Sequence, residues 1–338
     1  ALERRACAAD AVDAVLAVEA ARPFELARDL PLRALLLELG PDDHVLALVV
    51  HHIATDGWSM GRLLEDLATA YRARSAGEVP AHEPLPVQYA DYALWQRALL
   101  GEEADPGSLI GRQIAYWRTV LADAPVELAL PLDRPRPLRP QRAVGTVALS
   151  LPADLMARME ALARAQGATP FMVLHAAVSA LLSRLGAGED IVIGTPVAGR
   201  GDAALDRLVG FFVNTLVLRL DLAGDPAFAT LVARSREICL DAYMHQDVPF
   251  ERLVEVLDPP RVPGRQPLFQ TMLVLNRGVE GGFAAPGLEA RPLSVVATAA
   301  KFGKTRTVCD SPRPQRTCHR PSGESTSPST APKSAGPR

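Results

Sequence analysis

The stretch His51-His52-Ile53-Ala54-Thr55-Asp56-Gly57 carries the most information in this chain, because it brings two imidazoles, a carboxylate and a glycine to the end of an apolar run. Branched and apolar residues fill positions 45–50 immediately before it, and a second apolar run covers 32–39. Gly40-Pro41-Asp42-Asp43 separates the two runs and has the composition of a turn. The sequence therefore predicts a strand, a tight turn and a second strand that ends at the histidines.

The residues after Gly57 predict a helix. Apolar side chains recur at helical spacing, Ser59 is placed to cap the start, and Gly77 follows the end. The histidine stretch is thus a strand-to-helix loop, a place where rigid elements commonly hold catalytic side chains. Strand alternation puts His51 and His52 on opposite faces, so one imidazole can be buried while the other faces a cleft. The residues at helical spacing are Met60, Leu63, Leu64, Leu67 and Tyr71.

A structural interpretation of this stretch competes with a catalytic one. In the structural interpretation, both histidines are core residues with satisfied hydrogen bonds, and Asp56 only caps the following helix. Histidine is scarce, and two histidines, an aspartate and a glycine at four defined positions rarely occur together by chance. This favours the catalytic interpretation. The residue types indicate acyl transfer.

Composition indicates a globular protein with a sizeable core. Of 338 residues 48% are hydrophobic, and the formal net charge of -3 gives no electrostatic reason to expect nucleic acid or a membrane as partner. We find no apolar run of membrane length and no secretory signal. The cysteines have no disulfide or metal spacing, so we expect a cytoplasmic protein without a metal site. They are Cys7, Cys239, Cys309 and Cys318.

A proline-rich run over 131–140 divides the chain, because proline continues neither a helix nor a central strand. We expect an N-terminal lobe over 1–130, a connector over 131–142 and a C-terminal lobe over 143–302. Strands and helices interleave on both sides of the connector, which predicts two α/β lobes that share a central cleft. Helices are expected at 87–99, 110–121, 152–166, from Thr169-Pro170 onward and at 226–244; strands are expected at 144–151, 190–196, 210–220 and 268–275.

Six motifs in a fixed order carry a family resemblance. With the continuation Trp58-Ser59, the HHxxxDG stretch resembles the active-site motif of condensation domains of nonribosomal peptide synthetases, relatives of chloramphenicol acetyltransferase. The residues of the later motifs are most similar to those of the subtype that joins an L-configured donor to an L-configured acceptor. The later motifs are Tyr89-Ala90-Asp91-Tyr92-Ala93-Leu94-Trp95-Gln96, Ile193–Arg200, Gly210–Leu216, His245–Glu251 and Pro267-Leu268-Phe269-Gln270.

The resemblance implies two chloramphenicol acetyltransferase-like α/β lobes that form a V-shaped pseudo-dimer with a central cleft. It implies amide formation between a donor acyl or peptidyl thioester and an acceptor aminoacyl thioester in nonribosomal peptide biosynthesis. The two substrates are carried on the phosphopantetheine of upstream and downstream peptidyl carrier domains, with an adenylation domain as neighbour. The domain itself binds no cofactor.

The resemblance and the proton chemistry together suggest roles in the loop. His52 orients the acceptor amine and handles its proton, as a general base or as a positioning group, and backbone N–H groups near Gly57 face the developing oxyanion. His51, Asp56 and Trp58 are structural residues at the active site, and Ser59 is a cleft candidate. In the family this aspartate pairs with an arginine of the N-terminal segment.

Three further polar residues need separate interpretations. His175 lies within an apolar helix and is expected to be a packed residue. His245 ends a long helix, where its imidazole would bond terminal carbonyls or the following acid. Asn214 is either a strand residue that bonds a neighbouring loop or a cleft candidate of the second lobe, and the family analogy favours the cleft.

Both ends of the chain depart from the family pattern. The opening signatures of the family are absent, so we expect an incomplete first lobe without the arginine partner of Asp56. After Ala300-Lys301-Phe302 the composition changes to Pro, Ser, Thr and Arg, which predicts a disordered tail over 303–338. A reading-frame shift explains this change better than a natural linker. From these ends we expect a fragment that is itself inactive.

Two alternatives to a catalytic condensation domain stay open. One is another acyltransferase of the superfamily, which transfers an acyl group from a carrier protein or coenzyme A to a free alcohol or amine. The other is a non-catalytic module that docks carrier domains. The intact histidine pair and Gly57 count against the docking module.

Overall fold

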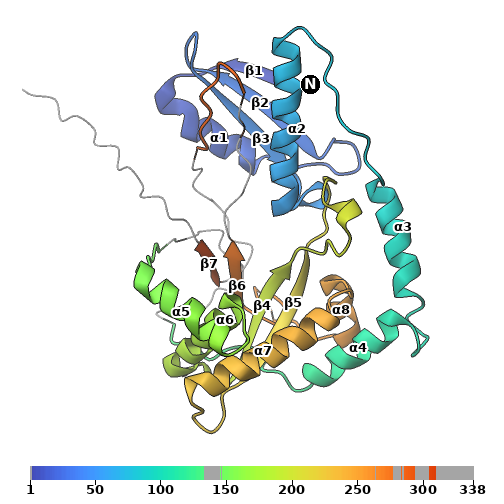
Figure 1. Ribbon diagram of the computed structural model, residues 1–338, viewed down its shortest axis with the longest axis vertical. Coiled ribbons are helices and arrows are strands. Elements are labelled where there is room, and N and C mark those ends of the chain that lie inside the picture. The colour runs from blue at the N-terminus through green and yellow to red at the C-terminus, as the bar shows by residue number, and fades with distance from the viewer. Residues whose placement is uncertain are drawn as a thin grey trace, which may run out of the picture.

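A computed structural model describes residues 2–132, 145, 147–262, 264–276, 283 and 285–293, and the backbone of 304–309. Two sheets, each with its own helices, lie at opposite ends of the molecule (Figure 1). We refer to residues 2–75 as the N-terminal region and to residues 109–276 together with 304–309 as the C-terminal region. Helix α3 (Tyr89–Leu100) runs between them.

The N-terminal region is a three-stranded sheet of order β1-β2-β3, covered on one face by helix α1. The predicted hairpin is confirmed: β2 and β3 pair antiparallel, with Leu37 opposite Val45. The strand β1, parallel to β2, and the helix α1 were not predicted. The elements are β1 (Leu2–Ala6), α1 (Val12–Ala21), β2 (Leu32–Glu38), β3 (His44–Val50) and α2 (Gly57–Ser75).

The C-terminal region is a mixed sheet of order β5-β4-β6-β7, with helices on both faces. Ile191 and Ile193 of β4 pack with α5, α6 and α7, whereas Val192 between them packs with α4 and α8, as strand alternation requires. The elements are α4 (Leu109–Val120), α5 (Ala153–Ala165), α6 (Pro170–Leu182), β4 (Asp190–Val197), β5 (Asn214–Asp221), α7 (Phe228–Met244), α8 (Phe250–Leu257), β6 (Thr271–Asn276) and β7 (Lys304–Cys309).

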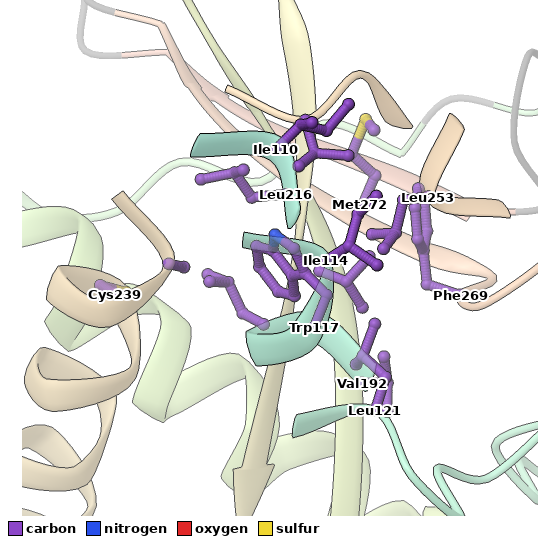
Figure 2. Close-up of a cluster of buried hydrophobic side chains, with 14 of the residues drawn as sticks. Ile110, Ile114, Trp117, Leu121, Val192, Leu216, Cys239, Leu253, Phe269 and Met272 are labelled. Carbon is purple, nitrogen blue, oxygen red and sulfur yellow. The ribbon is translucent and has the colours of Figure 1, made fainter. Parts of the chain in front are cut away.

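Helix α4 precedes the proline-rich run in sequence but packs into the core of the C-terminal region. Trp117 is 1% exposed and lies among Ile114, Leu216 and Cys239 (Figure 2). Its indole Nε1 donates to His245 O at 2.9 Å. The expected lobe boundary at 130 therefore does not coincide with the packing boundary, because a connector in the sequence says nothing about which core the preceding helix joins.

Three predicted strands need correction. The strand expected at 144–151 is wrong: none of its described residues is in a strand, and Val147 is 93% exposed. Among the described residues no strand pairs with this segment, so its backbone groups have no strand hydrogen bonds to form. The strand expected at 210–220 begins only at Asn214, because the backbone N–H groups of Gly210 and Phe212 bond side chains of the N-terminal region instead.

The strand expected at 268–275 begins at Thr271, because the backbone of Leu268 has a φ of 66°, which breaks an extended run. The tail prediction is wrong for six residues, since 304–309 form β7 along β6. Strand pairing uses backbone groups, so it needs little apolar surface. The rest of the predicted tail, and the connector from 133 to 142, lie outside the described residues.

The expectation of no apolar run of membrane length also needs correction. The described residues include one helical stretch, Pro170–Ala187, that is long and apolar enough to cross a membrane by length and composition. In the fold this stretch packs against the sheet and neighbouring helices, with Val173, Ala176 and Leu182 buried. Thr169 caps it as predicted, its hydroxyl accepting from Met172 N at 3.3 Å.

Candidate functional site

The histidine stretch lies between β3 and α2, at the end of the N-terminal region that faces the C-terminal region (Figure 1). His51 N donates to Pro31 O at 2.8 Å, which extends the β2–β3 pairing to the end of the strand. His52–Ala54 then form one 3-10 turn, and Asp56 begins α2 by accepting from Ser59 N at 2.8 Å. The loop is thus fixed at one end by strand pairing and at the other by the side-chain cap of Asp56.

The His52 imidazole is exposed and held by two contacts. Its Nδ1 lies 2.6 Å from Thr55 O, and its ring stands perpendicular to Phe211 at a centroid distance of 5.1 Å. A carbonyl only accepts, so Nδ1 carries the proton in the neutral ring and Nε2 presents a lone pair. No described hydrogen bond engages Nε2, so this nitrogen is free to take a proton from a bound reactant.

The His51 imidazole is in a different environment. It is half-buried, its Nδ1 accepts from Ile53 N at 3.1 Å, and its ring lies edge-on to Phe24 at 5.8 Å. An Nδ1 that accepts a backbone N–H helps to close the turn. The geometry therefore gives His51 a structural position and His52 an accessible one.

Asp56 is 5% exposed, and its arginine partner is within this chain, contrary to the expectation from the N-terminal signatures. Arg200 Nη2 lies 3.5 Å from Asp56 Oδ1 and donates to Ser59 Oγ at 2.8 Å, and the Arg200 side chain is 2% exposed. Its guanidinium also stacks on the Phe212 ring at 3.9 Å. Burial lowers the pKa of Arg200, and the Asp56 charge opposes this effect.

Ser59 was expected to line the cleft, but its side chain is fully buried in this network. Its hydroxyl lies 2.8 Å from Asp56 Oδ1 and 2.9 Å from Gly210 O, and it accepts from Gly210 N at 3.1 Å. Asp56 Oδ2 also accepts from Phe212 N at 3.1 Å. The network therefore ties the start of α2 to residues 200–212 of the C-terminal region.

Gly57 and Trp58 form the exposed first residues of α2. A Cβ built at Gly57 would meet no atom within 4 Å, so glycine relieves no clash within the described chain. No described hydrogen bond engages the Gly57 or Trp58 backbone N–H, and the first N–H groups of a helix favour negative charge. The Trp58 indole donates to Asp206 O at 3.0 Å, which adds another link between the regions.

Asn214 adopts the loop-bonding role. Its Nδ2 donates to Gln246 O at 2.7 Å and to Val248 O at 2.8 Å, and its Oδ1 accepts from Phe250 N at 3.0 Å. Both N–H groups are therefore used, although the residue also lines a cavity of about 410 Å³ between α3 and the loops of the C-terminal region. Asn214 therefore has no free side-chain N–H group for the cleft role that the family analogy favours.

The two other histidines interpreted from the sequence, His175 and His245, have structural contacts, as expected. His175 is fully buried, its Nδ1 lies 2.9 Å from Ser235 Oγ, and burial lowers its pKa to about 4. His245 Nδ1 lies 2.7 Å from Asp241 O, and the ring stacks on Tyr116 at 3.7 Å. Within the described residues no group of three His, Cys, Asp or Glu side chains is arranged to hold a metal ion.

Sequence reasoning assigned no role to Arg200, Tyr89 or Phe211, although all three stand in the quoted motifs. Tyr89 Oη donates to Phe211 O at 2.6 Å, and burial raises the pKa of Tyr89, helped by the Asp56 charge. A motif shows that a residue type recurs at a position, but not which distant residue it contacts. Only the fold brings positions 52, 89 and 211 together.

Comparison with known proteins identifies the family. The family model of the condensation domain matches residues 3–291. CymA of Salinispora arenicola, a probable non-canonical nonribosomal peptide synthetase, is 54% identical over 290 residues, which cover 86% of this chain and 4% of that protein. The dimodular nonribosomal peptide synthase of Bacillus subtilis is 48% identical over 287 residues, covering 85% of this chain and 12% of that protein.

A solved structure agrees with this result. The X-domain in its complex with OxyB from teicoplanin biosynthesis has a TM-score of 0.80 and 38% identity, covering 88% of this chain and 65% of that chain. The chain thus spans only a small part of the synthetases that it matches. It belongs to the condensation domain family of nonribosomal peptide synthetases.

Proposed function

We propose that this domain joins a donor acyl or peptidyl thioester to an acceptor aminoacyl thioester, with His52 handling the proton of the acceptor amine. Each reactant is carried on the phosphopantetheine arm of a separate carrier domain, one upstream and one downstream. The observation that carries the proposal is the exposed His52 ring, whose Nδ1 is engaged by Thr55 O at 2.6 Å so that Nε2 is free.

The reaction forms one C–N bond and breaks one C–S bond. The acceptor amine attacks the donor carbonyl, Nε2 of His52 takes the ammonium proton of the tetrahedral intermediate, and the donor sulfur leaves as a thiolate that receives the proton. The backbone N–H groups of Gly57 and Trp58, at the start of α2, face the developing oxyanion. Because Gly57 has no Cβ, the acyl group can approach this helix end closely.

Positioning contributes more to this reaction than base strength. An α-amino group has a pKa near 8, so about a tenth is neutral at pH 7 and freeing it costs on the order of 1 kcal/mol. Holding two tethered reactants in line is worth about 7 to 11 kcal/mol. His52 therefore acts as much by orienting the amine as by accepting its proton.

The same proposal includes the architecture and the partners. Two α/β lobes form a V-shaped pseudo-dimer around a cleft, and the histidine loop between the two sheets supports that arrangement. An adenylation domain is the expected neighbour, since the relatives are much longer synthetases. The expected subtype joins L-configured partners, and the expected location is the cytoplasm.

The test is His52→Ala in the synthetase polypeptide that carries this domain, with both carriers loaded. We expect amide formation, followed by intact-protein mass spectrometry of the carriers, to fall by at least about two orders of magnitude while the fold is kept. His51→Ala is the matched control and should lower stability more than chemistry. Equal turnover by wild type and His52→Ala removes His52 from the mechanism.

A docking module is the second candidate, because the similar X-domain structure is a complex with a second protein. In that case His52→Ala would leave the function of the domain unchanged, and only binding of a partner would be measurable. An acyltransferase with a free acceptor is distinguished in the same assay, because it would form product with a soluble amine or alcohol when the second carrier is omitted.

A further inference from the structure

The plane of the His52 ring depends on a residue from the other region of the molecule. Thr55 O engages Nδ1 and leaves the ring free to tilt about that contact. The Phe211 ring, perpendicular to it at 89° with centroids 5.1 Å apart, limits this tilt. The direction of the Nε2 lone pair is therefore set by where the Phe211 ring lies.

Phe211 lies in a segment without strand pairing, so its position has to be fixed by other contacts. Tyr89 Oη donates to the carbonyl of Phe211 at 2.6 Å, a good O–H···O distance. The Tyr89 ring also closes over the backbone, since a Cβ at Gly210 would lie 2.4 Å from it. Tyr89 thus holds the backbone from which the Phe211 ring projects.

We infer that Tyr89 is a positioning residue for His52, because its hydroxyl fixes Phe211 O and the Phe211 ring fixes the imidazole. This inference rests on the proposed role of His52 in amide formation. Tyr89 acts through another residue, so it shifts the orientation of Nε2 without exchanging a proton with substrate. A direct substrate contact is the competing role, since Tyr89 also lines the cavity of about 410 Å³ with Trp95.

The decisive variant is Tyr89→Phe, which removes one hydroxyl and keeps the ring. In the carrier-loaded synthetase we expect kcat to fall about fivefold to tenfold, the effect of one lost hydrogen bond, with KM unchanged. In this chain alone, the ring NMR signals of His52, its nitrogen signals included, should shift, because they depend on the distance and tilt of the Phe211 ring. A higher KM with unchanged His52 signals would overturn the inference and assign Tyr89 to substrate binding.

Tyr92→Phe is the matched control. Tyr92 belongs to the same aromatic cluster, with its ring 4.7 Å from Phe212, but no described hydrogen bond engages its hydroxyl. It should leave both kcat and the His52 signals unchanged. An equal change in Tyr92→Phe would attribute the effect to the cluster and not to the Phe211 carbonyl.

A double-mutant cycle tests the relay itself. If Tyr89 acts through Phe211, Tyr89→Phe combined with Phe211→Leu should be no slower than Phe211→Leu alone, and additive losses would overturn the inference. The proposed function is judged separately by His52→Ala. If that variant keeps its turnover the proposed chemistry fails, while the His52 nitrogen signals still decide whether Tyr89 positions the ring.

Discussion

Truncation of Arg200 to alanine should destabilise the domain strongly, because Arg200 is the buried partner of Asp56. The two residues are 144 positions apart in the sequence. The Arg200 side chain is 2% exposed and is 3.5 Å from Asp56 Oδ1, 2.8 Å from Ser59 Oγ and 3.9 Å from the Phe212 ring. Removing one partner of a buried ion pair costs about 3 to 5 kcal/mol. Asp56 keeps its bonds from Ser59 N and Phe212 N, so we expect about 3 kcal/mol.

The measurement is urea unfolding of wild type, Arg200→Ala and a matched control, followed by circular dichroism. The control is Arg207→Ala, whose partner Glu83 is 83% exposed, and an exposed pair of this kind contributes less than about 1 kcal/mol. Arg200→Lys keeps the charge but loses the forked donors, and should fall between the two. Equal losses below about 1 kcal/mol in Arg200→Ala and Arg207→Ala would refute the reasoning.

Three further outcomes are expected. Gly57→Ala should keep the unfolding free energy, since the added Cβ meets no atom within 4 Å, but should lower amide formation if the acyl group approaches there; unchanged turnover would contradict this. Burial lowers the pKa of His175 from 6.5 to about 4, so below pH 6.5 the unfolded chain takes up a proton that the folded protein does not. The free energy of unfolding should therefore be highest above pH 6.5 and decrease as the pH falls toward 4. The loss reaches about 3 kcal/mol, and His175→Leu should flatten this dependence in unfolding curves recorded across that range. Asn214→Asp should be less stable in urea than Asn214→Ala, because it turns a carboxylate toward two carbonyl oxygens at 2.7 and 2.8 Å.

Local patterns were enough to predict the hairpin and most helices. Turn residues between two apolar runs fix the register of β2 and β3, and the Thr169-Pro170 cap fixes the start of α6. These signals act over a few residues, so a single sequence contains them completely. The same holds for the strand-to-helix position of the histidine loop.

What the sequence did not reveal depends on contacts between distant residues. The expected strand at 144–151 has the right alternation, but alternation does not supply a partner strand. Helix α4 was placed with the first lobe because of the connector, although the burial of Trp117 puts it in the second core. Asn214 was assigned by analogy to the cleft, and its hydrogen bonds to two backbone carbonyls became visible only in the fold.

The largest difference concerns what makes the histidine loop rigid. The loop looks like a property of β3 and α2, yet its aspartate, serine and tryptophan bond residues 200–212 of the other region. Each of these contacts crosses between the two regions, so a movement of one region against the other must strain or break them. Substitution of Arg200 should therefore change catalysis as substitutions in the histidine loop do, although its side chain does not need to touch a substrate.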